Sequence, residues 1–286
     1  VDRMASLRNI FGGTDLLIAA HCEDQGIIKE NTDKYKKAYG DDVPLTLHPV
    51  IRSEEACYRS SELAVQLARE ANARLHIMHI STARELDLFS DAPLITKRIT
   101  AEACVSHLLF TEDDYQTLGA RIKCNPAIKT AEDRKALQEA VNSGLIDAIA
   151  TDHAPHLLSE KEGGALKAMS GMPMIQFSLA SMLELVDKDI FSIEKIVEKM
   201  SHAPAQMYEI NNRGFIHKGY QADLVLVRPN SKWTVTTDCI VSKCQWSPLE
   251  GHTFNWKVEK TFVNGHLLYD NGKIDETYRG QELRFR

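Results

Sequence analysis

The 286-residue chain lacks a long hydrophobic run and a cluster of basic residues. No apolar stretch approaches the ~20 residues that a membrane-spanning helix needs, so we expect no membrane association. The formal net charge is −6, from 34 Lys and Arg against 40 Asp and Glu. This balance argues against nucleic acid as a partner, because nucleic-acid sites are usually basic. A small-molecule ligand is therefore expected.

The chain also lacks several sequence signatures. Its six cysteines are scattered and form no CxxC pair, which is typical of reduced cytoplasmic proteins and not of secreted disulfide frameworks. A GxSxG nucleophile elbow and a glycine-rich phosphate loop are missing too, which argues against serine hydrolases and P-loop enzymes. We therefore predict a cytoplasmic protein whose chemistry uses other groups.

Apolar runs alternate with amphipathic segments over the first two thirds of the chain. The expected strands span residues 16–21, 75–81, 95–103 and 145–151, and the expected helices span residues 53–73, 131–143 and 192–202. This alternation predicts an α/β fold with a parallel sheet. Residues 214–227 and 261–270 instead favour short antiparallel strands. We place the domain boundary accordingly, with residues 1–210 in the first domain and residues 211–286 in a small second one.

Titratable side chains stand at the ends of three of the expected strands. His21 and His79 end two apolar runs, and Asp152 opens the sequence TDHAPH after a third. Sites on parallel α/β scaffolds lie at the carboxyl ends of strands. Imidazoles and a carboxylate are suitable ligands for Zn²⁺ or a similar ion. His76 lies three residues before His79, so alternation within a strand predicts that it faces the helix layer as a half-buried structural residue.

The motifs HCED at 21–24, LHIMHIST at 75–82 and TDHAPH at 151–156 occur in the order found in dihydroorotases of the amidohydrolase superfamily. The chain resembles this family over essentially its whole length. The resemblance implies a distorted (β/α)8 barrel, represented here by about strands 5–8, with a small C-terminal β-sandwich domain. It also implies a binuclear Zn²⁺ centre and reversible hydrolysis of dihydroorotate to N-carbamoyl-aspartate in pyrimidine biosynthesis.

The resemblance also implies residue roles. His21 and His79 would bind the second zinc ion, and Asp152 would bind the first and act as the general acid and base. Asn125 and His156 would contact the substrate carboxylate. The family's NPPLR-like motif reads Asn-Pro-Ala-Ile-Lys at 125–129, which leaves the role of Lys129 open. Residues 171–176 lie where the family has a substrate-facing loop, and an ordinary helix entry is an equally good interpretation.

One departure from the family pattern is large. The family's first strand carries a His-x-His pair, and none occurs in this sequence. We therefore expect the chain to be the C-terminal part of a longer polypeptide, with the remaining zinc ligands ahead of Val1. Two alternatives stay open: an allantoinase or dihydropyrimidinase type of cyclic amidohydrolase, or a non-catalytic homologue that serves as a structural partner. The sequence also leaves open whether the protein is a homodimer.

Overall fold

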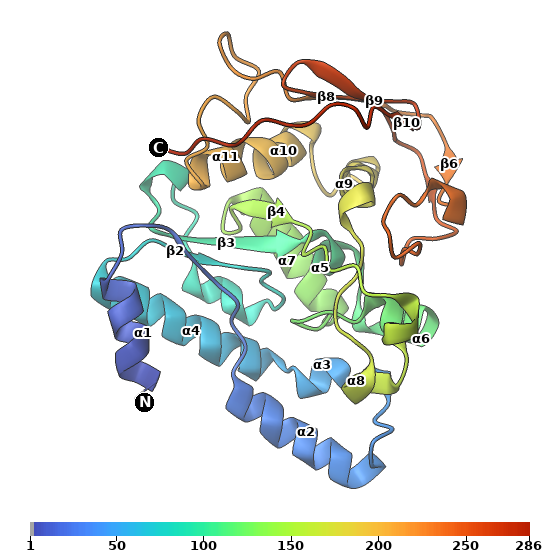
Figure 1. The fold of residues 1–286 in the computed structure, drawn as a ribbon. Coiled ribbons are helices and arrows are strands. Elements are labelled where there is room, and N and C mark those ends of the chain that lie inside the picture. Colours follow the sequence, from blue (N-terminus) through green and yellow to red (C-terminus); the bar gives the residue numbers. More distant parts are fainter. Residues whose placement is uncertain (1–2) are drawn as a thin grey trace. The chain divides into compact units, whose positions relative to one another are not determined.

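A computed structural model describes residues 3–286 of the chain. These residues divide into two compact units, the first ending at Ile175 and the second spanning Gln176–Arg286. The first unit contains a four-stranded parallel sheet, and the second contains a four-stranded antiparallel sheet and a two-stranded one (Figure 1). No helix in the described part of the chain is long and apolar enough to cross a bilayer.

The parallel sheet is built from four short strands that follow one another in chain order. They are β1 (Ile18–Ala20), β2 (Leu75–Ile77), β3 (Ile99–Cys104) and β4 (Ala148–Ala150), and each pairs in parallel with the next. This consecutive order requires a crossover after every strand and is the arrangement of (β/α) barrels. The expected α/β fold with a parallel sheet is confirmed.

The α-helices of the first unit lie before β1, after β4 and in two of the three connections between the strands, whereas the connection from β2 to β3 contains only 3₁₀ turns. The α-helices are α1 (Arg3–Gly12), α2 (Gln25–Tyr39), α3 (His48–Ile51), α4 (Glu54–Ala71), α5 (Val105–Leu109), α6 (Tyr115–Leu118), α7 (Ala131–Ser143) and α8 (Gly164–Lys167). The longest, α4, begins where the Ser53 hydroxyl accepts a hydrogen bond from the amide of Ala56, as N-cap residues do. It ends at Asn72, which adopts the left-handed conformation. Figure 1 shows α4 running along the sheet beside β2.

The second unit begins with helices and continues as antiparallel sheet. Its helices are α9 (Ser178–Asp187), α10 (Ile193–Val197) and α11 (Ala203–Met207), and its strands are β5 (Leu224–Arg228), β6 (Trp233–Thr234), β7 (Thr253–Phe254), β8 (Lys257–Val263), β9 (His266–Asp270) and β10 (Lys273–Ile274). The larger sheet has the order β10-β9-β8-β5 and is antiparallel throughout. The predicted change to antiparallel structure is thus confirmed. The predicted domain boundary at residue 210 stays a prediction, because a compact unit need not coincide with a domain defined from the sequence.

The predicted segments differ from the observed elements mainly at their ends. Helix α7 has the predicted bounds, because Thr130 and Asp133 form a capping box at its start and Gly144 ends it. The expected strand over 95–103 begins later, at Ile99, since Leu94–Thr96 form a 3₁₀ turn after Pro93. Proline at the start of such a turn fixes φ and cannot donate to a sheet.

Candidate active site

The predicted site residues of the first unit lie just beyond the ends of parallel strands. His21 directly follows β1, His79 lies two residues beyond the end of β2, and Asp152 lies two residues beyond the end of β4. Carboxyl ends of parallel strands share one edge of a sheet, and sites on such sheets lie along that edge. The local sequence, an apolar run followed by a polar residue, is what positions each of these side chains.

The two histidines are in direct contact. Nδ1 of His21 lies 3.0 Å from Nε2 of His79, and the rings meet edge to face at an interplanar angle of 76°. His79 is buried, with 5% of its surface exposed, whereas the side chain of His21 is 39% exposed. The pair therefore has one solvent-accessible ring and one that is held inside the protein.

A buried carboxylate orients His21 from its other side. Oε2 of Glu23 lies 3.0 Å from Nε2 of His21 and also accepts a hydrogen bond from the guanidinium of Arg52. Burial alone raises the pKa of Glu23, but the hydrogen bond with His21 and the charges of Arg52 and Lys129 lower it overall. The carboxylate of Glu23 accepts the Nε2 proton of His21, and Nδ1 of the same ring faces His79.

Burial keeps the second ring neutral. It lowers the pKa of His79, and the adjacent His21 lowers it further, against the opposing effect of the Asp152 charge. Nδ1 of His79 is buried and has no hydrogen-bond partner among the described residues. A neutral imidazole is the form that binds a metal ion, and the nitrogen of His79 that faces His21 is Nε2, not the unpartnered Nδ1.

Backbone strain marks two of the predicted residues. His79 and Asp152 have φ values of 42° and 43°, in the left-handed region. Non-glycine residues seldom adopt this conformation, and when they do they are concentrated at functional sites. Asp152 is exposed, so its carboxylate is accessible to a substrate or to water.

The two predicted substrate-binding residues lie in loops of the same unit. Asn125 is half-buried, and its side-chain oxygen Oδ1 is buried without a hydrogen-bond partner in residues 3–286. His156 is half-buried, with Nδ1 3.5 Å from Oε2 of Glu160. The Asn125 side chain thus presents an unsatisfied acceptor, and His156 presents an imidazole beside an acid.

The donor set of the described residues provides part of a metal site. His21 and His79 converge through two nitrogens, which suits zinc. Among residues 3–286, however, the structure contains no cluster of three or more His, Cys, Asp or Glu side chains arranged to hold a metal ion. The structure therefore brings His21 and His79 together but does not join Asp152 to them as a third ligand.

Sequence reasoning missed part of the surroundings of the pair. The acid in the HCED motif, Glu23, orients His21, and its position two residues after a strand-end histidine was the available signal. The prediction for His76 was wrong on burial. This residue is fully buried, and its ring nitrogens lie 2.9 Å from the Thr100 hydroxyl and 3.1 Å from the Glu102 carboxylate, both on β3. These polar partners explain how the fold accommodates a fully buried imidazole.

The cysteines take no part in this arrangement. All six are free thiols, as predicted, and Cys22, Cys57, Cys104 and Cys124 are buried. Burial raises the pKa of Cys22 and that of Cys124 to about 12. A thiol with such a pKa is protonated at neutral pH and is a poor nucleophile.

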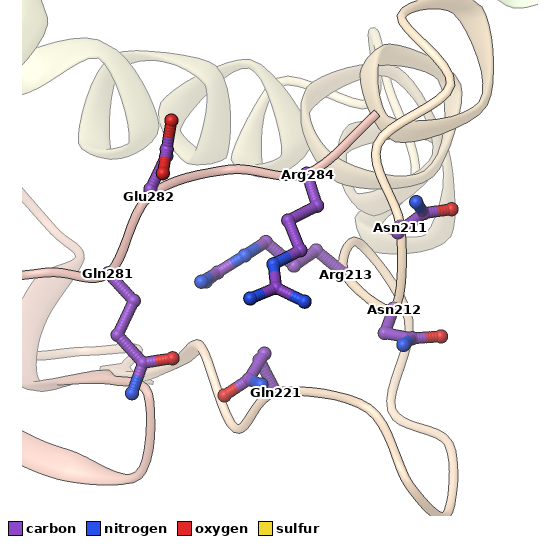
Figure 2. Close-up of a pocket in the computed structure, with 7 residues that line it drawn as sticks. All are labelled: Asn211, Asn212, Arg213, Gln221, Gln281, Glu282 and Arg284. Carbon is purple, nitrogen blue, oxygen red and sulfur yellow. The ribbon is translucent and has the colours of Figure 1, made fainter. Parts of the chain in front are cut away.

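The second unit has a polar cleft of its own. It has a volume of about 490 Å³ and is lined by Asn211, Asn212, Arg213, Gln221, Gln281, Glu282 and Arg284. Figure 2 shows the side chains of Arg213 and Arg284 extending over it. Arg213 forms an ion pair with Asp223. None of the predicted site residues lines this cleft.

Comparisons with known proteins agree with the family resemblance. The sequence model described as "Amidohydrolase family" matches residues 3–268. A dihydroorotase of Clostridioides difficile is 38% identical over 205 residues, which are 71% of this chain and 48% of that protein. A dihydroorotase of Pyrococcus furiosus is 31% identical over 93% of this chain and 58% of its own length. An allantoinase of Bacillus velezensis is 30% identical over 90% of this chain and 56% of its own length.

A solved structure supports the same relationship. An L-hydantoinase (dihydropyrimidinase) from Arthrobacter aurescens has a TM-score of 0.88 and 26% sequence identity, over 94% of this chain and 61% of that one. The chain thus spans about half the length of the curated relatives that it matches.

Proposed function

The chain belongs to the amidohydrolase family, whose TIM-barrel-like α/β fold it shares, and we propose that it is the C-terminal part of a dihydroorotase. Its relatives support a hydrolase of cyclic amides that depends on metal. The proposed reaction is the reversible hydrolysis of the ring amide of dihydroorotate to N-carbamoyl-aspartate. Cytoplasmic location and a role in pyrimidine biosynthesis belong to the same proposal.

One observation carries the proposal more than any other. Nδ1 of His21 and Nε2 of His79 converge at 3.0 Å, and Glu23 orients the ring of His21. Metal-binding histidines characteristically donate their second ring proton to a carboxylate. Asp152 follows β4 of the same sheet, so a proton-accepting group is available along that edge.

The proposed metal centre contains two zinc ions. His21 and His79 would bind one of them, and Asp152 would bind the other. The remaining ligands are proposed to lie on a segment ahead of Val1, because the sequence has no His-x-His pair and the described residues form four parallel strands. When bound, the ions would lower the pKa of water and polarise the ring carbonyl.

The residues of this chain would do the rest of the chemistry. Asp152 would accept a proton from the attacking water and transfer it to the departing ring nitrogen, as a general base and then a general acid. The side-chain amide N–H groups of Asn125 and a ring N–H of His156 would donate to the carboxylate that distinguishes dihydroorotate from uncharged cyclic amides. Ring closure of N-carbamoyl-aspartate would use the same groups in reverse order.

A substrate panel tests the proposal directly. The full-length, zinc-loaded protein is assayed with dihydroorotate, allantoin, hydantoin and dihydrouracil. Dihydroorotate should have the highest kcat/KM. A preference for an uncharged ring would overturn the assignment in favour of an allantoinase or dihydropyrimidinase. That second candidate is supported by the similarity to the allantoinase and the L-hydantoinase.

Metal content separates both enzymes from a non-catalytic homologue. About two zinc ions per full-length chain would be expected for the enzyme, and none for a purely structural partner. The oligomeric state, including a homodimer, can be measured on the same samples by light scattering.

A further inference from the structure

Lys161 is a buried lysine whose ammonium is held by backbone oxygens. It closes the 3₁₀ turn Leu158–Lys161, a few residues after the TDHAPH motif, and is 5% exposed. Its Nζ donates to the carbonyl oxygens of Lys123 at 3.1 Å, Met169 at 2.7 Å and Gly171 at 2.6 Å. An ammonium has three N–H donors, so these three oxygens match its donor capacity.

Gly171, whose carbonyl accepts a hydrogen bond from Lys161, lies next to His156. Gly171 has a φ of +136°, and a Cβ placed on it would lie 2.5 Å from Cβ of Ala154 and 3.0 Å from Cδ2 of His156. The amide of Ala154 donates to the carbonyl of Met172 at 3.1 Å. The segment that Lys161 holds at Met169 and Gly171 is therefore packed directly against the loop that carries His156.

Lys123, whose carbonyl also accepts a hydrogen bond from Lys161, is close to Asn125 in the sequence. Lys123 lies two residues before it, and its carbonyl accepts both the Lys161 ammonium and the amide of Gly171, the latter at 2.7 Å. The Lys123 side chain in turn donates to the carbonyl of Ala168. These hydrogen bonds tie the segment that leads to Asn125 to the segment that packs on His156.

We propose that Lys161 is a positioning residue, which fixes the spacing of Asn125 and His156 and thereby the recognition of the substrate carboxylate. The inference rests on the proposed function, since it concerns the substrate that those two residues would bind. Burying an ammonium is costly unless charge-assisted hydrogen bonds compensate for it. A fold that only needed to fill this volume would do so with an apolar side chain at lower cost.

The charge of Lys161 is available at neutral pH. Burial lowers its pKa to about 8, and the charge of the nearby Lys123 ammonium acts in the same direction. The group is therefore mostly protonated at pH 7, when all three N–H donors are present.

Replacing Lys161 separates positioning from mere stability. In the full-length zinc-loaded protein, Lys161→Met should raise KM for dihydroorotate about tenfold and change kcat by less than about twofold. Lys161→Gln, which keeps two N–H donors, should have a smaller effect on KM. Lys167→Met is the matched control, because Lys167 is exposed and lies on the same segment, and both kinetic constants should stay unchanged.

Hydrogen exchange gives a readout that does not depend on turnover. The amides of Ala154 and Gly171, which donate to Met172 and Lys123, should exchange faster in Lys161→Met than in the control. An unchanged KM in both Lys161 variants, or a lower kcat with KM unchanged, would overturn the positioning role. If the wild type does not turn over dihydroorotate, the proposed function fails. If exchange at the two amides is also the same in Lys161→Met as in the control, the positioning role of Lys161 fails too.

Discussion

Nδ1 of His21 and Nε2 of His79 lie 3.0 Å apart although 58 positions separate the residues in the chain. The parallel pairing of β1 with β2 aligns Ala20 with Ile77, and the amide of Met78 then donates to the carbonyl of Ala20. The left-handed backbone of His79 follows this last ladder bond. A strand pairing and one strained residue together therefore produce the contact, which no local sequence feature could create alone.

Glu23 should control the metal affinity of this pair without binding the metal. Glu23→Gln removes the ionised acceptor of the His21 ring proton, and loss of such an outer-shell partner typically weakens metal binding about 10–100-fold. Zinc affinity of the full-length protein, measured by competition with a chelating dye, checks this expectation. Glu30→Gln serves as control, because Glu30 is exposed on α2. Equal zinc affinities of the two variants would contradict the role given to Glu23.

Asp152 should be essential for turnover and dispensable for folding. Asp152→Asn removes the proton acceptor and should lower kcat about 10²–10⁴-fold. Asparagine tolerates the left-handed backbone that Asp152 adopts, at a φ of 43°, so the melting temperature of the metal-free protein should change little. Asp189→Asn is a matched control, since Asp189 is exposed and has a φ of 57°. Turnover of dihydroorotate by Asp152→Asn at the wild-type rate would refute the proton-transfer role.

Periodicity predicted the scaffold well and the site only in part. Helix α7 was predicted with its observed bounds because its caps are local in sequence. The ends of β3 were not, because the turn after Pro93 competes with strand formation. Strand-end histidines could be recognised as candidates. Their contact, and the burial of His76 against Thr100 and Glu102, depend on register between distant strands, which no single segment encodes.

Gly171 should tolerate no side chain, because it packs against the TDHAPH loop. A Cβ there would lie 2.5 Å from Cβ of Ala154 and 2.9 Å from its carbonyl oxygen. Gly171→Ala should lower the free energy of unfolding by about 1–3 kcal/mol beyond the cost of the backbone conformation itself. Gly144→Ala isolates that backbone cost, because Gly144 also has a positive φ, +92°, but a Cβ added to it would meet no atom within 4 Å. Urea denaturation of the two variants measures the difference, and equal losses of stability would show that the close packing at Gly171 has no energetic weight.

Two buried histidines should make the protein less stable in mild acid. Burial lowers the pKa of His48 and that of His107 to about 3, from the ordinary value of 6.5. Their Nε2 atoms donate to the carbonyls of Cys124 and Pro126. Below pH 6.5 the unfolded chain takes up protons at these rings and the folded chain does not. The free energy of unfolding therefore falls as the pH decreases from 6.5 towards about 3. Each of the two histidines lowers it by about 1.4 kcal/mol for each pH unit.

A variant that cannot titrate isolates this contribution. His107→Gln keeps an N–H donor for Pro126 and removes the ionisable ring, so between pH 6.5 and pH 5 it should lose about 2 kcal/mol less stability than the wild type. Urea denaturation at both pH values measures the two losses. His217→Gln is the control for the substitution itself, because His217 is exposed. A His107→Gln protein with the same pH dependence as the wild type would mean that His107 takes up its proton in the folded state as readily as in the unfolded one.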